Sequence, residues 1–157
     1  SLFGDLTFNR SVVLMADHSQ TGSVGFILNK PLHHLISDFV PAIHADFQVY
    51  IGGPVDQDSL FFIHNSPEKI QNSQLIANGI YWGGNFNQVC QLINDNEIDD
   101  TNIRFFLGYS GWNENQLELE IQTKSWILAK NDVENKILEK AKSDFWTFKM
   151  NELGGTY

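Results

Sequence analysis

Cysteine is almost absent from the sequence, which contains only Cys90 among its 157 residues. One cysteine excludes an internal disulfide and any zinc site built from several cysteines, and it suits a reducing compartment. Long apolar runs are absent as well, since no window approaches 18 consecutive apolar residues. Residues 1–10 lack the basic and apolar regions of a secretion signal. We therefore expect a cytoplasmic protein that does not span a membrane.

Positive charge is also scarce. The chain has 10 Lys and Arg against 19 Asp and Glu, which gives a formal net charge of −9. Nucleic-acid binding needs clustered cations that displace counterions from phosphates, so direct nucleic-acid binding is not expected. The lysines favour the last third of the chain, where they could still form a local basic face. These lysines are Lys124, Lys130, Lys136, Lys140, Lys142 and Lys149.

Apolar and aromatic residues, by contrast, are plentiful. Hydrophobic residues make up 42% of the chain, with 12 Phe, 4 Trp and 4 Tyr. This composition is the reverse of the signature of disorder. A chain of this length forms about one domain, so residues 1–157 are expected to fold as a single domain with a sizeable core.

Short apolar runs rich in β-branched residues dominate the first half of the chain. Residues 11–16 and 23–28 predict a β-hairpin around a polar link, and proline at position 31 is expected to end its second strand. A short helix or helical turn is expected within residues 33–39. The glycines and proline of residues 52–54 suit a sharp turn, and Asn78 with Gly79 suits a hairpin turn. Further strands are expected at residues 48–51, 59–64, 75–77 and 80–82.

Helical periodicity dominates the second half. Asn85 is expected to cap a helix whose apolar residues fall on one face, and residues 102–108 predict a buried strand. Asn113 and Gln116 resemble a capping box that opens a helix over residues 117–121, although that stretch alternates like a strand. A last strand is expected at 125–129, and helices from 132 and over 144–153. Strand pairs followed by helices favour an α/β or α+β fold with a mixed sheet.

Five segments, taken in order and at their spacing, resemble the AlgH/YqgE family of bacterial proteins. They are residues 8–13 (FNRSVV), 17–18 (DH), 25–31 (GFILNKP), 52–55 (GGPV) and 108–121 (GYSGWNENQLELEI). The resemblance covers nearly the whole chain. It implies a mixed α/β fold of two intimately packed subdomains, in cytoplasmic proteins whose biochemical activity is not settled. One branch is named for regulating alginate synthesis, so a role as transcriptional regulator is implied by resemblance alone.

Candidate functional residues come from the segments that carry the resemblance. They are Arg10, His18, Asn29, Gly53, Trp112, Gln116 and Glu118. Arg10 is one of only two arginines, and an ion pair with Glu118 or Glu120 is the favoured interpretation, with substrate capture as the alternative. His18 could act as a general acid or base, as could His64. Convergence of Arg10, His18, Asn29 and Trp112 on one concave surface would indicate a site.

Other motifs are interpreted as structural. Ser110 lies in an incomplete nucleophile-elbow pattern, so residues 108–112 are expected to form a tight strand-to-helix turn with Trp112 buried over it. His33 and His34 have the wrong spacing for a metal-binding helix, and Cys90 falls on an apolar helix face. Gly83 and Gly84, like the glycines at 52–53, could expose amides to an anion, but a turn needs the same residues. No metal or cofactor is expected.

No set of nucleophile, base and stabilising groups is evident in the sequence. The leading hypothesis is therefore a non-enzymatic binding or regulatory protein that acts through protein partners. The alternative is a small hydrolase or anion-binding enzyme that uses His18 and Arg10. A nucleic-acid regulator that uses the C-terminal lysines is a third possibility, and the oligomeric state stays open.

Overall fold

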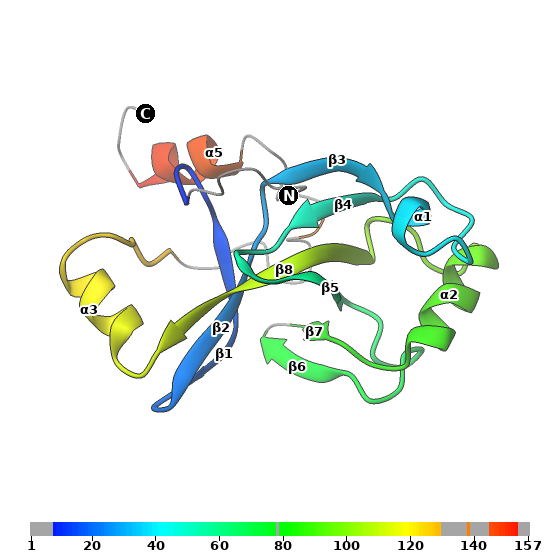
Figure 1. Cartoon of the computed structure of the whole chain (residues 1–157), viewed down its shortest axis with the longest axis horizontal. Helices are drawn as coiled ribbons and strands as arrows, with labels where there is room; N and C mark the ends of the chain where they lie inside the picture. Colours follow the sequence, from blue (N-terminus) through cyan, green and yellow to red (C-terminus); the bar gives the residue numbers. More distant parts are fainter. Residues whose placement is uncertain (1–7, 78, 130–137, 139–144, 154–157) are drawn as a thin grey trace.

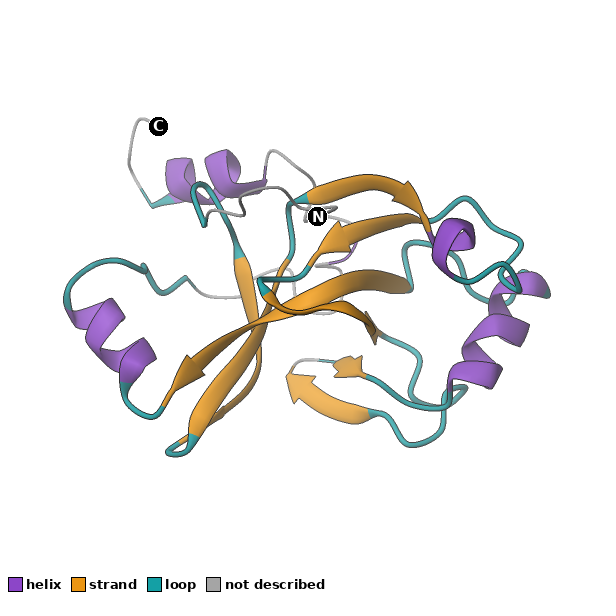
Figure 2. Ribbon diagram, in the orientation of Figure 1, coloured by secondary structure: helices purple, strands orange, loops and turns teal. Residues whose placement is uncertain are grey.

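The structure, a computed structural model, describes residues 8–77, 79–129, 138 and 145–153. Strands in this part of the chain form a mixed eight-stranded sheet (Figures 1 and 2). Helices α1 (Ile36–Phe39) and α2 (Phe86–Asn94) lie at one end of the sheet, and α3 (Gln116–Gln122) lies at the other. The α/β class with a mixed sheet, predicted from the sequence, is confirmed.

The longest strand, β8 (Ile103–Asn113), organises the sheet. Its first half lies between β4 (Gln48–Ile51), which runs parallel to it, and β5 (Val55–His64), which runs antiparallel. Its second half pairs antiparallel with β2 (Gly22–Ile27). The first half is buried on both faces, which explains an apolar run interrupted only by Arg104, whereas buried and exposed residues alternate at the far end.

The predicted N-terminal hairpin is confirmed, and it is longer than predicted. Strands β1 (Val13–Ser19) and β2 continue through the polar link, so that His18 pairs with Ser23 and Ser19 with Gly22. Pro31 does not follow β2 directly: it begins β3 (Pro31–Leu35), which pairs with β4. The short helix or helical turn predicted within 33–39 is confirmed as the single turn α1, which begins at Ile36 because residues 31–35 belong to β3.

Most of the remaining local predictions are confirmed. Strands β6 (Gln74–Ala77) and β7 (Ile80–Trp82) pair as a hairpin. Asn85 caps α2, because its side-chain oxygen accepts a hydrogen bond from the Gln88 amide at 3.1 Å. Residues 116–122 form a helix despite their alternation, and α5 (Phe145–Glu152) is the predicted closing helix.

Three predictions were wrong or fall outside the described residues. Residues 108–112 are not a strand-to-helix turn, because pairing with β2 keeps the chain extended as far as Asn113. Residues 125–129 form a loop rather than a strand. The helix predicted from position 132 lies outside the described residues, apart from Leu138.

Gly52 and Gly53 carry the chain from one side of β8 to the other. The Gly52 amide donates to the Leu107 carbonyl at 2.8 Å, and the Gly52 carbonyl accepts from the Ile27 amide at 2.9 Å. A Cβ on Gly53 would lie 2.2 Å from the Tyr109 backbone. Glycine is required here because two backbones cross in contact, rather than because a turn is sharp.

Buried apolar side chains gather in two clusters that share β8. Phe105 and Leu107 join the cluster that contains Val89 and Ile93 of α2. Phe106 joins the other cluster. Successive residues of a strand face opposite ways, so one strand supplies both clusters.

Candidate functional site

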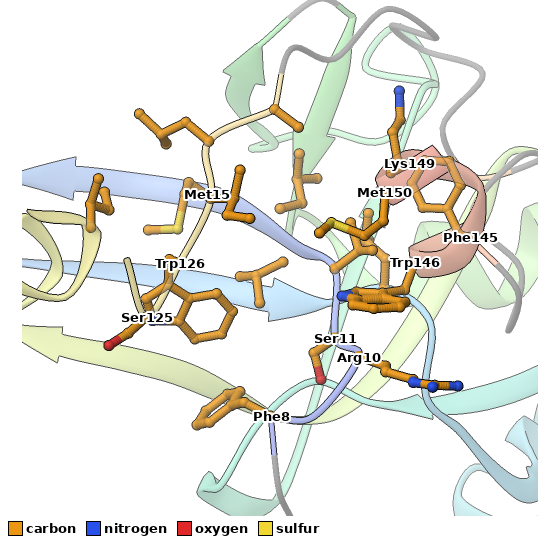
Figure 3. Close-up of a pocket in the computed structure, with 18 of the residues that line it drawn as sticks. Phe8, Arg10, Ser11, Met15, Ser125, Trp126, Phe145, Trp146, Lys149 and Met150 are labelled. Carbon is orange, nitrogen blue, oxygen red and sulfur yellow. The ribbon is translucent and has the colours of Figure 1, made fainter. Parts of the chain in front are cut away.

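A cavity of about 680 Å³ lies between β1, the segment that follows α3, and α5 (Figure 3). Three of the four tryptophans in the chain line it, namely Trp112, Trp126 and Trp146. Its volume falls within the range of roughly 300–1,000 Å³ that is usual for ligand sites. We call it the aromatic groove. Other apolar residues that line it include Phe8, Met15, Leu28, Leu117, Ile121, Ile127, Leu128, Phe145, Met150 and Leu153.

Two of the tryptophans are held in place by one carboxylate. Glu120 Oε1 accepts hydrogen bonds from Trp126 Nε1 at 2.8 Å and from Trp112 Nε1 at 3.4 Å. The rings of Trp112 and Trp126 meet edge to face, with centroids 5.8 Å apart, and Phe8 packs on Trp126 in the same way. These contacts fix one aromatic wall of the groove before any ligand arrives.

Part of the apolar lining of the cavity is open to solvent. Ile127 is 58% exposed and Leu128 is 74% exposed, and both line the groove. Leu153, at the end of α5, is also exposed at its edge. Contiguous exposed apolar surface of this kind marks interaction sites, whereas single exposed side chains do not.

Arg10 lies at the edge of the groove, but not in the predicted ion pair. Its guanidinium stacks on the Trp146 ring at 5.3 Å from the centroid, as Figure 3 shows, and it makes no ion pair with a described residue. The prediction failed because both acidic candidates are engaged elsewhere. Glu118 contacts His18, and Glu120 holds the two indoles.

Asn29 supports the segment that carries Arg10. Its side-chain amide donates to the Arg10 carbonyl at 2.8 Å, and its side-chain oxygen accepts from the Val12 amide at 2.9 Å. Asn29 is buried, and it does not line the groove. Its role is to hold the wall formed by residues 10–12.

His18 and Glu118 form a second polar cluster with Ser23. His18 Nε2 lies 3.2 Å from Glu118 Oε1, and His18 Nδ1 lies 2.5 Å from the Ser23 hydroxyl. A Ser-His-Glu chain resembles a hydrolytic triad, but Ser23 is buried within a paired strand and lacks the exposure of a nucleophile. The cluster instead fastens α3 to the hairpin, since Glu118 belongs to α3.

The predicted convergence is therefore partial. Arg10 and Trp112 line the same groove and Asn29 braces it, but His18 does not line it. Arg10 precedes β1 while His18 lies near the far end of that strand, and the five steps from Val13 to His18 alone span roughly 16 Å. Gly53 is a packing residue. Gln116 accepts a hydrogen bond from the Asn113 amide at 2.9 Å, but the N-cap of α3 is Asn115, so the predicted capping box does not form.

The other residues singled out in the sequence occupy packed positions that give them a structural role. The buried Ser110 hydroxyl donates to the Gly52 carbonyl at 3.1 Å. Burial raises the pKa of the Cys90 thiol, so its nucleophilic thiolate is disfavoured.

The described residues contain no group of three His, Cys, Asp or Glu side chains placed to bind a metal ion. Among the described helices, none is long and apolar enough to cross a membrane.

Trp112 is predicted to contribute strongly to stability. It is 6% exposed and lies between the sheet and the groove, so Trp112→Ala removes a large aromatic from packing. We expect a loss of roughly 3–5 kcal/mol in the free energy of unfolding, measured by urea denaturation. Leu128→Ala, at an exposed position, is the control and should change it little. An unchanged melting temperature for Trp112→Ala would contradict this assignment.

His64 is a buried neutral histidine rather than a catalytic one. Its Nε2 donates to the Gly83 carbonyl at 3.1 Å, and its Nδ1 accepts from the Ser66 amide at 3.1 Å. Burial lowers the pKa of His64 below its ordinary value of 6.5, although the Gly83 carbonyl and Glu68 oppose part of the shift. Protonation of Nδ1 would also break the bond from Ser66.

A pH dependence of stability follows from this neutral histidine. Below pH 6.5 the unfolded chain binds a proton that folded His64 resists, so stability falls as the pH falls through that value. We expect wild type to lose more unfolding free energy than His64→Gln between about pH 7.5 and about pH 5.5. Equal losses, measured by urea denaturation, would mean that His64 titrates in the folded protein as it does in the unfolded chain.

Arg104 is the polar residue that sequence reasoning missed. It is 4% exposed, it donates to the carbonyls of Leu28 at 3.0 Å and Leu138 at 2.6 Å, and its guanidinium lies 4.2 Å from the centroid of the Tyr50 ring. Burial lowers its pKa, but arginine stays charged at neutral pH. The available signal was a lone arginine within a run of apolar residues predicted to be a buried strand.

Two solved structures place this fold in a known class. The solution structure of the AlgH protein from Pseudomonas aeruginosa matches with a TM-score of 0.74 at 22% identity, over 99% of this chain and 85% of that one. The crystal structure of protein DIP2367 from Corynebacterium diphtheriae matches with a TM-score of 0.73 at 22% identity, over 98% and 85%. At this identity the likeness concerns the fold alone.

Sequence comparison then gives the family. The AlgH-like family pattern matches residues 1–157. A UPF0301 protein from Cytophaga hutchinsonii is 40% identical over 156 residues, which cover 98% of this chain and 85% of the relative. Another, from Bacteroides fragilis, is 38% identical over 155 residues, covering 98% and 78%. The chain belongs to the AlgH-like family, and the resemblance seen in the sequence is confirmed.

Proposed function

We propose that this chain is a cytoplasmic, non-enzymatic binding protein that acts through protein partners, and that the aromatic groove receives a segment of the partner. The observation that carries the proposal is the gathering of three tryptophans in one open cavity. Tryptophan is enriched among the few residues that carry most of the binding energy of protein interfaces, and these residues cluster in well-packed pockets. Any transcriptional effect would be a consequence of that contact.

The extent of the apolar surface favours a polypeptide segment as the occupant. A small ligand enclosed in the cavity would leave Ile127 and Leu128 in water. An amphipathic segment laid along the groove would cover both the tryptophan walls and this exposed edge, as in helix-in-groove recognition. The enzymatic alternative draws less support, because His18 and Arg10 do not meet at one cavity.

The test uses peptides selected on the protein itself. Random displayed peptides of about 12 residues would be selected on wild type, and the enriched sequences measured by fluorescence polarisation. Ile127→Asp places a carboxylate in the groove at an exposed position and is expected to weaken binding roughly tenfold or more. Leu75→Asp is the matched control, since Leu75 is 61% exposed on β6 and does not line the groove.

The two variants give opposite expectations. Leu75→Asp should bind the selected peptides as wild type does, and both variants should keep wild-type circular dichroism. If no peptide is enriched, or if Ile127→Asp binds as tightly as Leu75→Asp, the groove is not the binding site.

A further inference from the structure

The charged residues described in the lining of the aromatic groove are all positive. Among the described residues that line it, three are cations, Arg10, Lys124 and Lys149, and none is Asp or Glu. The whole chain carries 19 acidic residues against 10 basic ones, so the charge of the described groove lining is opposite in sign to the net charge of the chain. The groove therefore presents a positive rim on an acidic protein.

Two of the three cations have no acidic partner within the described part of the chain. Lys149 pairs with Glu152 at 3.2 Å, and Figure 3 shows its ammonium directed away from Arg10. Arg10 contacts the Trp146 ring, and Lys124 is exposed on the segment after α3. Arg10 and Lys124 thus bring to the groove, from separate segments, charges that no described acidic side chain neutralises.

A buried hydroxyl lies beside Arg10. Ser11 lines the groove, is 9% exposed, and its Oγ has no hydrogen-bond partner among the described residues. A buried hydroxyl without a partner destabilises the free protein, so such groups are few and each needs a reason. A ligand atom that accepts a hydrogen bond would supply the missing partner.

We infer that the segment received by the aromatic groove is both apolar and acidic, and that one of its carboxylates is bound by the Arg10 guanidinium together with the Ser11 hydroxyl. This inference rests on the proposed function. A guanidinium pairs with a carboxylate in a forked geometry, and a serine hydroxyl donates to it. The apolar side chains of the segment pack on Trp112, Trp126 and Trp146, and Lys124 attracts further acidic residues.

The test compares each selected peptide with a version in which every Asp and Glu is replaced by Asn and Gln. The amide version keeps the shape and loses the charge. We expect it to bind wild type roughly tenfold more weakly or worse, and the acidic peptide to weaken as salt rises from about 50 mM to about 500 mM. Arg10→Glu should abolish the preference for the acidic peptide. Lys69→Glu makes the same change of charge outside the groove and should retain the preference.

Ser11→Ala separates a binding role from a structural one. Removal of an unpartnered hydroxyl should leave the melting temperature unchanged or raise it, while affinity for the acidic peptide falls severalfold. If Ser11 has a structural role instead, Ser11→Ala should lower the melting temperature. If Ser11→Ala binds the acidic peptide as wild type does, the hydroxyl is not part of the carboxylate site.

The possible failures are distinguishable. If the selected peptides bind in the groove but the amide versions bind equally well, the carboxylate site is wrong and the proposed function stands. If no peptide binds, both fail. If laurate binds in the groove with loss in Arg10→Glu while no peptide does, the occupant is a small apolar carboxylate rather than a partner segment, and the inference about the segment is overturned.

Discussion

Gly53→Ala is expected to cost at least about 3 kcal/mol of unfolding free energy, because its new Cβ meets backbone on β8 rather than a movable side chain. That Cβ would lie 2.2 Å from the Tyr109 carbonyl carbon and oxygen and 2.4 Å from the Ser110 nitrogen. Relief by a local shift is costly, because neighbouring Gly52 is hydrogen-bonded to Leu107 of β8 and to Ile27 of β2. The substitution therefore forces two strands of the sheet apart.

Gly111→Ala is the matched control on β8 itself. The nearest atom to its new Cβ is a Tyr109 ring carbon at 3.4 Å, which is ordinary contact. We expect a change of less than about 1 kcal/mol, measured for both variants by urea denaturation with a circular dichroism signal. Equal stability of the two variants would show that the crossing at Gly53 has more room than the structure gives it.

The loss at Gly53 should also reach the binding site indirectly. Residues 110–113 of β8 pair with β2, and this pairing fixes the register in which Trp112 lies opposite Ser23. Trp112 forms part of the groove wall and shares Glu120 with Trp126. If Gly53→Ala pushes β8 away from its neighbouring strands, the aromatic wall is disturbed even in the molecules that stay folded.

Features set by neighbouring residues could be predicted from the sequence. Asn85 caps α2 through the backbone amide of Gln88, three residues away. The capping box predicted at Asn113 was wrong, because Asn113 ends β8 and α3 begins after Asn115, whose side chain makes no capping hydrogen bond. The Asn85 hydrogen bond closes within one helical turn, so residue type and spacing were enough to predict it. The hairpin of β1 and β2 is likewise local.

Features set by distant partners could not be predicted in this way. The extension of β8 past Gly108 depends on pairing with β2, where Gly25 lies opposite Ser110. The groove joins Trp112, Trp126 and Trp146 from a strand, a loop and a helix, and no periodicity links those positions. Arg10 was given the wrong partner, because the competing contacts of Glu118 and Glu120 appear only in the folded chain.

Arg104 is predicted to be the most consequential charged residue for stability. Arg104→Met is expected to lower the unfolding free energy by about 3–5 kcal/mol, because the carbonyls of Leu28 and Leu138 both lose a buried donor. Leu28 also lines the aromatic groove, so the same loss loosens a wall of the binding site. Arg104→Lys should recover little, since one ammonium cannot reproduce the planar fork that reaches two carbonyls and stacks on Tyr50.

An opposing effect makes this prediction discriminating. Burial of a guanidinium is costly, and replacement of a buried charge by an apolar side chain of similar size is neutral or stabilising in some proteins. A double-mutant cycle of Arg104→Met with Tyr50→Leu, measured by urea denaturation, isolates the contact between the guanidinium and the Tyr50 ring. Because the ring contact is desolvated, we expect a coupling of about 1–2 kcal/mol between the two side chains. An Arg104→Met protein as stable as wild type, with no coupling to Tyr50, would mean that the desolvation of Arg104 outweighs its hydrogen bonds, and that the arginine is retained for something other than the stability of the sheet.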